Sequence, residues 1–202
     1  EKFYNKVFYQ HGFDQADAIR LLKYELSNIC NPIVLDFGCD VGNQAQLIRD
    51  LNGIWFGLDL LSSPGVDSRN SFQNNVVAYD GMKIPFKSDS FDIIFSRQVF
   101  EHVENLHSVF GELSRILKPG GKLIGSTSHL EPYHSNSYWS ITPYGFERLL
   151  SKSGFQLKII SAGIDCYSLI TTRIIINFLP TEFAKLFVKI LIQLQIQDMC
   201  GN

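Results

Sequence analysis

The stretch Ile-Val-Leu-Asp-Phe-Gly-Cys-Asp-Val-Gly, residues 33–42, decides the fold of this chain of 202 residues. Its first three residues are apolar and two of them are β-branched, which is typical of a buried strand. The strand runs into Asp36 and a turn with glycine at positions 38 and 42, and the apolar positions of residues 45–51 then indicate a helix. A strand, a glycine turn and a helix N-terminus form the corner at which α/β proteins bind phosphate or nucleoside groups.

The glycine spacing separates two kinds of nucleoside-binding corner. The dinucleotide fingerprint requires glycine at positions 38, 40 and 43, whereas this chain has Asp40 and Asn43. A nicotinamide-dependent reductase is therefore disfavoured.

Further carboxylates follow at the spacing that a nucleoside site requires. The next apolar stretch, residues 54–58, ends in Asp59, which lies 17 positions after Gly42. A carboxylate at the end of a second strand can accept hydrogen bonds from both hydroxyls of a ribose. A third strand, over residues 76–79, ends in Asp80-Gly81.

The pattern Asp36-x-Gly38-x-x-x-Gly42 resembles motif I of the class I S-adenosylmethionine (SAM)-dependent methyltransferases, normally Asp-x-Gly-x-Gly-x-Gly, with Asp40 in place of the middle glycine. The phrase Val-Phe-Glu-His-Val at residues 99–103 resembles the family's Leu-Glu-His-Val element after the fourth strand. Weaker similarity continues through residues 142–144 and 153–155 to about residue 162. On these matches the chain is identified as a member of this family, similar to its stand-alone small-molecule enzymes (methyltransferase type 11-like).

The resemblance, with the alternation of β-branched runs and helical patterns, predicts an α/β fold. We expect a doubly wound, mostly parallel, Rossmann-like seven-stranded sheet of order 3-2-1-4-5-7-6, with an antiparallel seventh strand and helices on both faces. Strands are predicted at residues 32–36, 54–58, 75–79, 91–96, 121–126, 155–160 and 169–178, the last of which also suits a buried helix. Helices are predicted at residues 42–51, at 104–117 and from a Thr142 cap to about residue 153.

The length fits one domain over residues 1–202, with an N-terminal helical or lid segment over residues 1–31 and an apolar helix over residues 179–202. Polar side chains recur only every fourth residue in that last helix, so something must cover it. The alternatives are the domain core, a homodimer partner, and a membrane surface or lipid-linked substrate contacted peripherally. A membrane-spanning helix is not expected, because polar residues and Pro180 interrupt the apolar stretch before it reaches about 20 residues.

Charge and cysteine content limit the kinds of binding partner and the cellular compartment that we expect. The net charge is −2 and no basic run occurs, which argues against a nucleic-acid substrate. The four cysteines, Cys30, Cys39, Cys166 and Cys200, have no paired spacing, so reduced thiols in a cytoplasmic protein are expected rather than disulfides or a metal site. No signal-peptide pattern opens the chain, and its start at Glu1 suggests a natural N-terminus further upstream.

The resemblance implies SAM as cofactor and gives each motif a role. The turn would lie beside the methionine part of SAM, with Asp36 ordering the turn or binding the amino group. The end of the second strand would hold the ribose, Asp80 and the residues after it would bind adenine, and the end of the fourth strand would lie near the methionine. The implied cofactor-binding residues are Asp36, Gly38, Cys39, Asp40, Gly42, Asp59, Leu60, Asp80, Gly81, Met82, Ser96 and Arg97.

Asp40 leaves two interpretations open. Its side chain could crowd the cofactor and repel the methionine carboxylate, or it could attract the amino group or sulfonium. The first interpretation gives the alternative function of a catalytically impaired SAM-binding or scaffold protein.

We expect the molecule that accepts the methyl group to bind beside residues 127–142, because loops at the carboxyl ends of parallel strands line the ligand site. Histidine is the natural base for a hydroxyl acceptor near pH 7, which makes His129 and His134 candidates, with His102 of the Glu-His phrase third. The predicted function is methyl transfer from SAM to a small molecule, most plausibly to an oxygen of a sugar, a lipid-linked intermediate or a secondary metabolite.

Overall fold

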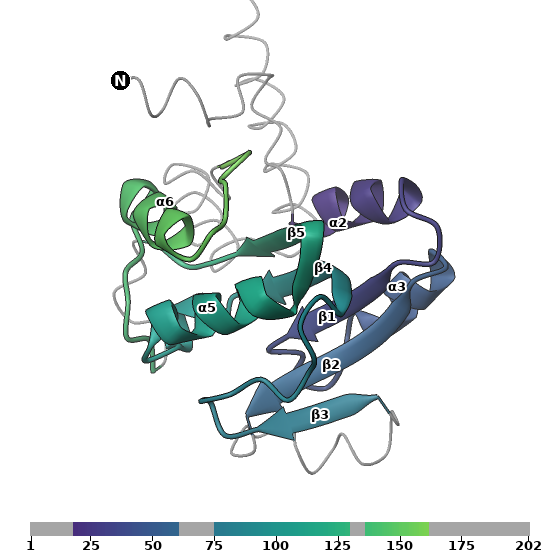
Figure 1. Cartoon of the computed structure of the whole chain (residues 1–202), viewed down its shortest axis with the longest axis horizontal. Coiled ribbons are helices and arrows are strands. Elements are labelled where there is room, and N and C mark those ends of the chain that lie inside the picture. The colour runs from purple at the N-terminus through teal and green to yellow at the C-terminus, as the bar shows by residue number, and fades with distance from the viewer. Residues whose placement is uncertain (1–17, 61–74, 130–135, 162–202) are drawn as a thin grey trace, which may run out of the picture. The chain divides into compact units, whose positions relative to one another are not determined.

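The computed structural model describes residues 18–60, 75–129 and 136–161 (Figure 1). Residues 18–158 form one compact unit, and residues 1–17 with 159–202 form a second. Of the second unit only residues 159–161 are described, with an isolated β-bridge residue at Ile160. The fold below is that of the first unit.

Five parallel strands form the sheet of this unit. They are β1 (Ile33–Phe37), β2 (Ile54–Leu60), β3 (Val76–Tyr79), β4 (Phe91–Arg97) and β5 (Leu117–Ser126), in the order β3-β2-β1-β4-β5. The predicted order is confirmed for these five strands, and the strand before the glycine turn is central. Because the strand order reverses between β1 and β4, the carboxyl ends of these two strands mark the position at which such sheets bind ligands.

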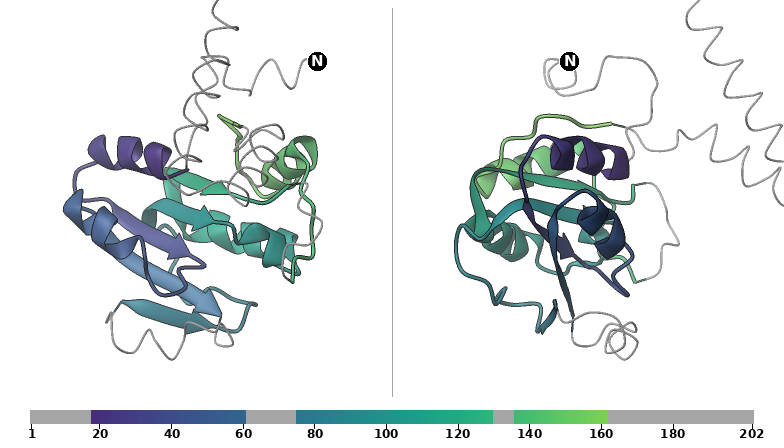
Figure 2. Two further views of the ribbon diagram at one scale, coloured as in Figure 1. Left: turned by 180° about the vertical axis from the view of Figure 1, so that it is seen from behind. Right: turned by 90° about the vertical axis from the view of Figure 1, so that its right-hand side faces the viewer.

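The alternation of side chains along β1 separates two apolar cores. Leu35 and Phe37 belong to the core under α5 (Leu106–Ile116) and α6 (Pro143–Lys152). Val34 belongs to the core under α2 (Ala18–Ser27) and α3 (Ala45–Asp50), where Trp55 is also buried. Figures 1 and 2 show these helix pairs on the two faces of the sheet, which confirms the doubly wound prediction.

Aromatic rings fix the segment that follows β4. This segment contains the short helix η1 (Phe100–His102), and the Phe100 ring stacks on Phe37 of β1 with centroids 6.0 Å apart. The same ring packs on Phe110 of α5 at 4.7 Å and on Phe146 of α6 at 5.9 Å. Residues 99–103 are therefore held on the sheet beside the end of β1.

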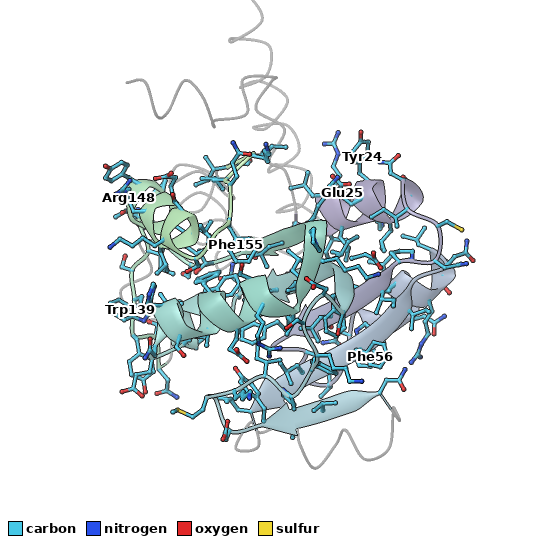
Figure 3. The ribbon with its side chains drawn as sticks, in the orientation of Figure 1. Tyr24, Glu25, Phe56, Trp139, Arg148 and Phe155 are labelled. Carbon is cyan, nitrogen blue, oxygen red and sulfur yellow. The ribbon has the colours of Figure 1, made fainter. Side chains whose placement is uncertain are left out.

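Two ion pairs connect α2 to β5 and brace the amino ends of the strands. Lys122 of β5 pairs with Glu25 of α2, which is labelled in Figure 3. At the amino ends of the strands, the Asp92 carboxylate accepts from Lys118 Nζ and from the backbone N–H of Ile33, both at 2.8 Å. Asp92 therefore braces the sheet at the edge opposite the glycine turn.

The structure corrects the predicted boundaries around Lys-Pro-Gly-Gly, residues 118–121. The helix ends at Ile116 and β5 begins at once with Leu117, which pairs with Phe91. The ladder resumes only at Lys122 opposite Ile93, so residues 118–121 form an irregularity within β5 rather than a turn before it. Pro119 cannot donate to the ladder, and Gly120 has a φ of +79°, which explains the interruption.

Two further predictions differ from the structure. The helix after the glycine turn begins at Ala45 rather than at residue 42, because residues 40–44 are used in the turn. Residues 155–159 form no strand, although residues 155–160 were predicted as the sixth. The alternating Phe155 and Leu157 instead pack on the core under α5 and α6 without entering the ladder.

Several predictions lie outside the described residues. They are the seventh strand at residues 169–178, the helix at 179–202 and the greater part of the 1–31 segment, of which residues 18–27 form α2.

The predicted cap of α6 is confirmed, since Thr142 Oγ1 accepts from Gly145 N at 3.1 Å and Pro143 opens the helix.

Candidate functional site

The turn after β1 is closed against β2. Gly38 has a φ of +75°, and its N–H donates to the carbonyl of Leu58 at 2.8 Å. Gly42 has a φ of +80° and donates to the carbonyl of Cys39 at 2.8 Å, while the Cys39 side chain is buried. Both glycines stand where other residues would be strained, within the turn that the sequence predicted.

Asp59 joins the end of β2 to this turn. The N–H of Asp40 donates to Asp59 Oδ2 at 2.7 Å, and the N–H of Leu60 donates to Oδ1 at 2.7 Å. A carboxylate has about four acceptor positions, so one side chain can bind several donors at once. Asp40 itself has a φ of +46°, which aspartate tolerates better than most residues.

The side chain of Asp36 is buried in the core beside the turn. Its side chain is only 3% exposed and accepts from the indole Nε1 of Trp55 at 3.2 Å, on the face covered by α2 and α3. Burial raises the pKa of Asp36 to about 7; the Trp55 hydrogen bond opposes this and the charge of Asp59 adds to it. Asp36 therefore lies within the core beside the turn.

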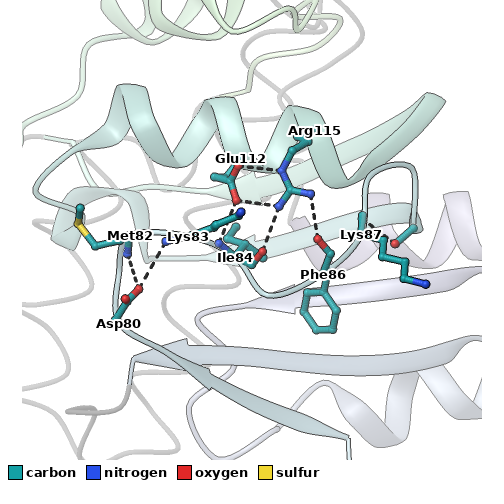
Figure 4. Close-up of polar contacts among 9 residues, drawn as sticks. Asp80, Met82, Lys83, Ile84, Phe86, Lys87, Glu112 and Arg115 are labelled. Carbon is teal, nitrogen blue, oxygen red and sulfur yellow. Dashed lines mark hydrogen bonds and ion pairs between the residues drawn. The ribbon is translucent and has the colours of Figure 1, made fainter.

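The segment after β3 is shaped by Asp80 and held by α5 (Figure 4). Asp80 Oδ1 accepts from Met82 N at 2.9 Å and Lys83 N at 3.4 Å, around Gly81 with a φ of +84°. This local hydrogen bonding is typical of an Asx turn.

An ion pair on α5 fixes the residues that follow. Glu112 accepts from the N–H of Ile84 at 3.0 Å, and Arg115 donates to the carbonyls of Ile84 and Phe86 at 3.0 and 2.9 Å. The Arg115 hydrogen bonds hold the pKa of Glu112 below its usual value. The loop carrying Asp80 and the exposed Met82 is thus attached to a helix on the sheet.

The carboxylates at the ends of β2 and β3 act on a common neighbour. Burial, and then the charges of Asp59 and Asp80, raise the pKa of Tyr79 to about 12. The predicted ribose and adenine residues therefore share one acidic region at the carboxyl edge of the sheet.

The end of β4 contributes Ser96 and Arg97. Ser96 is fully buried, and its hydroxyl oxygen has no hydrogen-bond partner among the described residues. Arg97 is exposed at the carboxyl end of β4. A buried hydroxyl without a protein partner beside the end of β1 suits a site for a polar ligand group.

Glu101 is a buried carboxylate that the sequence analysis did not select as a site residue. It is fully buried and accepts from Thr127 Oγ1 at 2.9 Å and from Ser128 N at 3.2 Å. Its position before His102 in the family phrase was the available signal, but the sequence could not show that it is buried against the end of β5.

Two of the three candidate bases, His102 and His129, lie within the described residues. His102 Nδ1 lies 3.3 Å from the carbonyl oxygen of Asn136, so this nitrogen is the donor. His129 is exposed just after β5, and His134 lies outside the described residues. The cofactor candidates do meet, since all twelve belong to the carboxyl ends of β1 to β4 or to the turns that follow them.

Comparisons with known proteins agree with this arrangement. Residues 35–125 match the family model described as a methyltransferase domain. The chain is 32% identical over 109 residues to sterol 4-C-methyltransferase of Caenorhabditis elegans, covering 50% of this chain and 32% of that protein. It is 33% identical over 136 residues to sterol 24-C-methyltransferase of Schizosaccharomyces pombe, covering 60% of this chain and 35% of that protein. The chain thus spans about a third of these curated relatives.

A solved structure described as a SAM-dependent methyltransferase from Archaeoglobus fulgidus has the same fold, with a TM-score of 0.58 at 17% identity, covering 69% of this chain and 67% of that one. Within the part of this chain that the structure describes, no helix has the length and apolar character needed to cross a membrane. The glycine turn, the acidic strand ends, the sheet order and the matched domain lead to one conclusion: residues 35–125 form a methyltransferase domain of the class I SAM-dependent type.

Proposed function

We propose that this protein binds SAM at the carboxyl edge of β1 to β4 and transfers its methyl group to a small-molecule acceptor. The observation that carries the proposal is the bond from Asp40 N to Asp59 Oδ2, which joins the glycine turn to the acidic end of β2. This bond holds the Asp59 carboxylate beside a turn whose glycines have positive φ, which supports a ribose site there. A nucleoside with an attached polar chain suits both parts.

The residues of this edge fit the parts of SAM. Asp59 would hold the ribose, the Asp80 turn would lie beside adenine, and residues 38–42 with Ser96 would accommodate the methionine part. Bound SAM supplies a methyl group already activated on a sulfonium. What remains for the chain is to hold cofactor and acceptor at reacting distance, which can contribute roughly 7–11 kcal/mol.

We expect the acceptor to bind beside residues 127–129 and 136–141, which follow β5 and precede α6. His129 is the described base candidate there, and Tyr138 and Trp139 are 60% and 47% exposed, so aromatic surface is available to an apolar acceptor. This surface and the sterol-modifying relatives favour a lipid-like acceptor, and a histidine base favours an oxygen atom as the methylated position.

The second candidate function is SAM binding without turnover, and Asp40 favours it. A charged residue stands at a φ of +46° where the family pattern has glycine. If its side chain occupied cofactor space, the site would bind SAM weakly and position it poorly.

Calorimetric titration of the full chain with SAM, S-adenosylhomocysteine and NAD separates these functions. Binding of SAM and S-adenosylhomocysteine without NAD supports the proposed site, and binding of NAD alone would reject it. Incubation with SAM carrying a labelled methyl group and a panel of sugar nucleotides, phenols and sterols then distinguishes an enzyme, which labels one of them, from a binding protein, which labels none.

Replacing Asp59 by alanine is expected to weaken SAM binding about 10- to 150-fold. The change removes a charge-assisted contact to the ribose, worth roughly 1.5–3 kcal/mol, and releases the N–H of Asp40. Calorimetry on the folded variant measures the effect. Asp50→Ala is the matched control, because Asp50 is an exposed carboxylate of α3 bonded to Gln46. Equal SAM affinities in the two variants would refute the role of Asp59.

Replacing Asp40 by glycine is expected to tighten SAM binding by up to about tenfold, which corresponds to about 1.4 kcal/mol. Glycine suits the φ of +46° and removes both the bulk and the charge beside the methionine carboxylate. Asp40→Asn keeps the bulk and removes the charge, so comparing the two variants separates the causes. A tenfold weaker affinity in both would instead show that Asp40 holds the cofactor's amino group.

A further inference from the structure

The carboxylate of Glu101 ties the segment after β4 to the end of β5. Its two oxygens accept from Thr127 Oγ1 and from Ser128 N, and the residue is fully buried. A buried carboxylate is stable only when its oxygens are bonded, so these contacts are costly to break. The positions of Thr127 and Ser128 therefore depend on this side chain.

Backbone carbonyls of Glu101 and Val103 bind residues 138 and 139, which precede α6. The N–H groups of Tyr138 and Trp139 donate to the carbonyl of Glu101 at 2.8 and 3.3 Å. The indole Nε1 of Trp139, labelled in Figure 3, donates to the carbonyl of Val103 at 2.7 Å. Residues 138 and 139 are thus held by backbone groups, whereas residues 127 and 128 are held by a side chain that substitution can remove.

We infer that Glu101 is a positioning residue, which holds residues 127–129 against the segment that also holds residues 136–139. It thereby fixes His129, the residue after Ser128, relative to the segment after β4. The assignment of an acceptor to this region rests on the proposed function, whereas the contacts of Glu101 do not. Glu101 acts on the acceptor side and makes none of the contacts assigned to SAM, so its loss disturbs acceptor use and leaves cofactor affinity unchanged.

Three variants of the full chain separate positioning from charge and from general stability. Glu101→Ala removes both side-chain bonds, whereas Glu101→Gln keeps an acceptor for Ser128 N and a polar partner for Thr127. Thr127→Val removes one bond without opening a cavity at Glu101, which keeps the test decisive if Glu101→Ala does not fold. Asp92→Asn is the control, because Asp92 braces the opposite edge of the sheet.

Two readouts report on this region directly. Amide hydrogen exchange follows the N–H of Ser128. Acrylamide quenching of fluorescence follows Trp139, because the second tryptophan of the chain, Trp55, is only 1% exposed. S-adenosylhomocysteine affinity, measured by calorimetry, serves as the cofactor readout.

In Glu101→Ala we expect Ser128 exchange to be at least about tenfold faster, while Trp139 quenching stays unchanged because its backbone contacts remain. S-adenosylhomocysteine affinity should stay within about twofold of the wild type. Glu101→Gln should restore slow exchange at Ser128, and Thr127→Val should give a smaller acceleration. For whichever acceptor of the panel the wild type methylates, Glu101→Ala should raise KM about tenfold.

The inference is overturned if Ser128 exchange does not change in Glu101→Ala and Thr127→Val, or if Asp92→Asn accelerates it equally. It is also overturned if Glu101→Gln behaves as Glu101→Ala, because the charge rather than the positioning would then matter. If the wild type binds neither SAM nor S-adenosylhomocysteine, the proposed function is wrong. The exchange data would still decide the role of Glu101.

Discussion

Replacing Gly38 by alanine is expected to destabilise the fold by about 2–5 kcal/mol. A residue with a Cβ at a φ of +75° costs roughly 1–2 kcal/mol, and the added methyl would lie 2.3 Å from Val99 Cγ2, an overlap that typically costs about 1–3 kcal/mol more. Denaturant unfolding followed by circular dichroism gives the difference.

Two other glycines provide matched controls for Gly38→Ala. At Gly120 the φ is +79° but a Cβ meets nothing within 4 Å, so Gly120→Ala measures the backbone cost alone. At Gly111, inside α5, neither problem exists, and alanine should stabilise by about 0.5–1 kcal/mol. A Gly38→Ala variant no less stable than Gly120→Ala would show that Val99 moves aside freely. In a Val99→Ala background the cost at Gly38 should fall toward that at Gly120.

Replacing Asp36 by asparagine is expected to remove a pH dependence of up to about 4 kcal/mol from the free energy of unfolding. Burial raises the pKa of Asp36 to about 7 from an ordinary value of 3.8. The folded state therefore holds a proton that the unfolded chain releases. The stability from this group is fully present below about pH 4 and is lost as the pH rises through about 7, at about 1.4 kcal/mol per pH unit.

The measurement is the free energy of unfolding between pH 4 and pH 8 for wild type and Asp36→Asn. Asparagine keeps an acceptor for Trp55 Nε1 and cannot ionise, so the variant should gain stability relative to the wild type as the pH rises. Asp92→Asn is the contrasting control, because the Lys118 and Ile33 hydrogen bonds outweigh burial and lower the pKa of Asp92, so its contribution is lost as the pH falls. Parallel curves for wild type and Asp36→Asn would contradict the inferred burial.

The core of the fold could be predicted from the sequence because its signals are local. Apolar runs of strand length, glycine at 38 and 42, and the Thr-Pro opening of α6 act within a few neighbouring residues. The boundaries near residues 118–121 and 155–159 were less predictable. There the chain's pairing with β4, or its packing against α5, decides whether an apolar residue joins the ladder.

For the candidate site, too, some features could be predicted from the sequence and others only from the tertiary structure. Which carboxylates stand at the carboxyl ends of β1, β2 and β3 was determined by the sequence alone, since the ends of parallel strands meet at one edge. What each carboxylate does was decided only by tertiary structure: Asp59 binds the turn, Asp36 is buried against Trp55, and Glu101 holds the end of β5. These roles depend on burial and on hydrogen bonds between residues about 20 or more positions apart, and neither is encoded in local spacing.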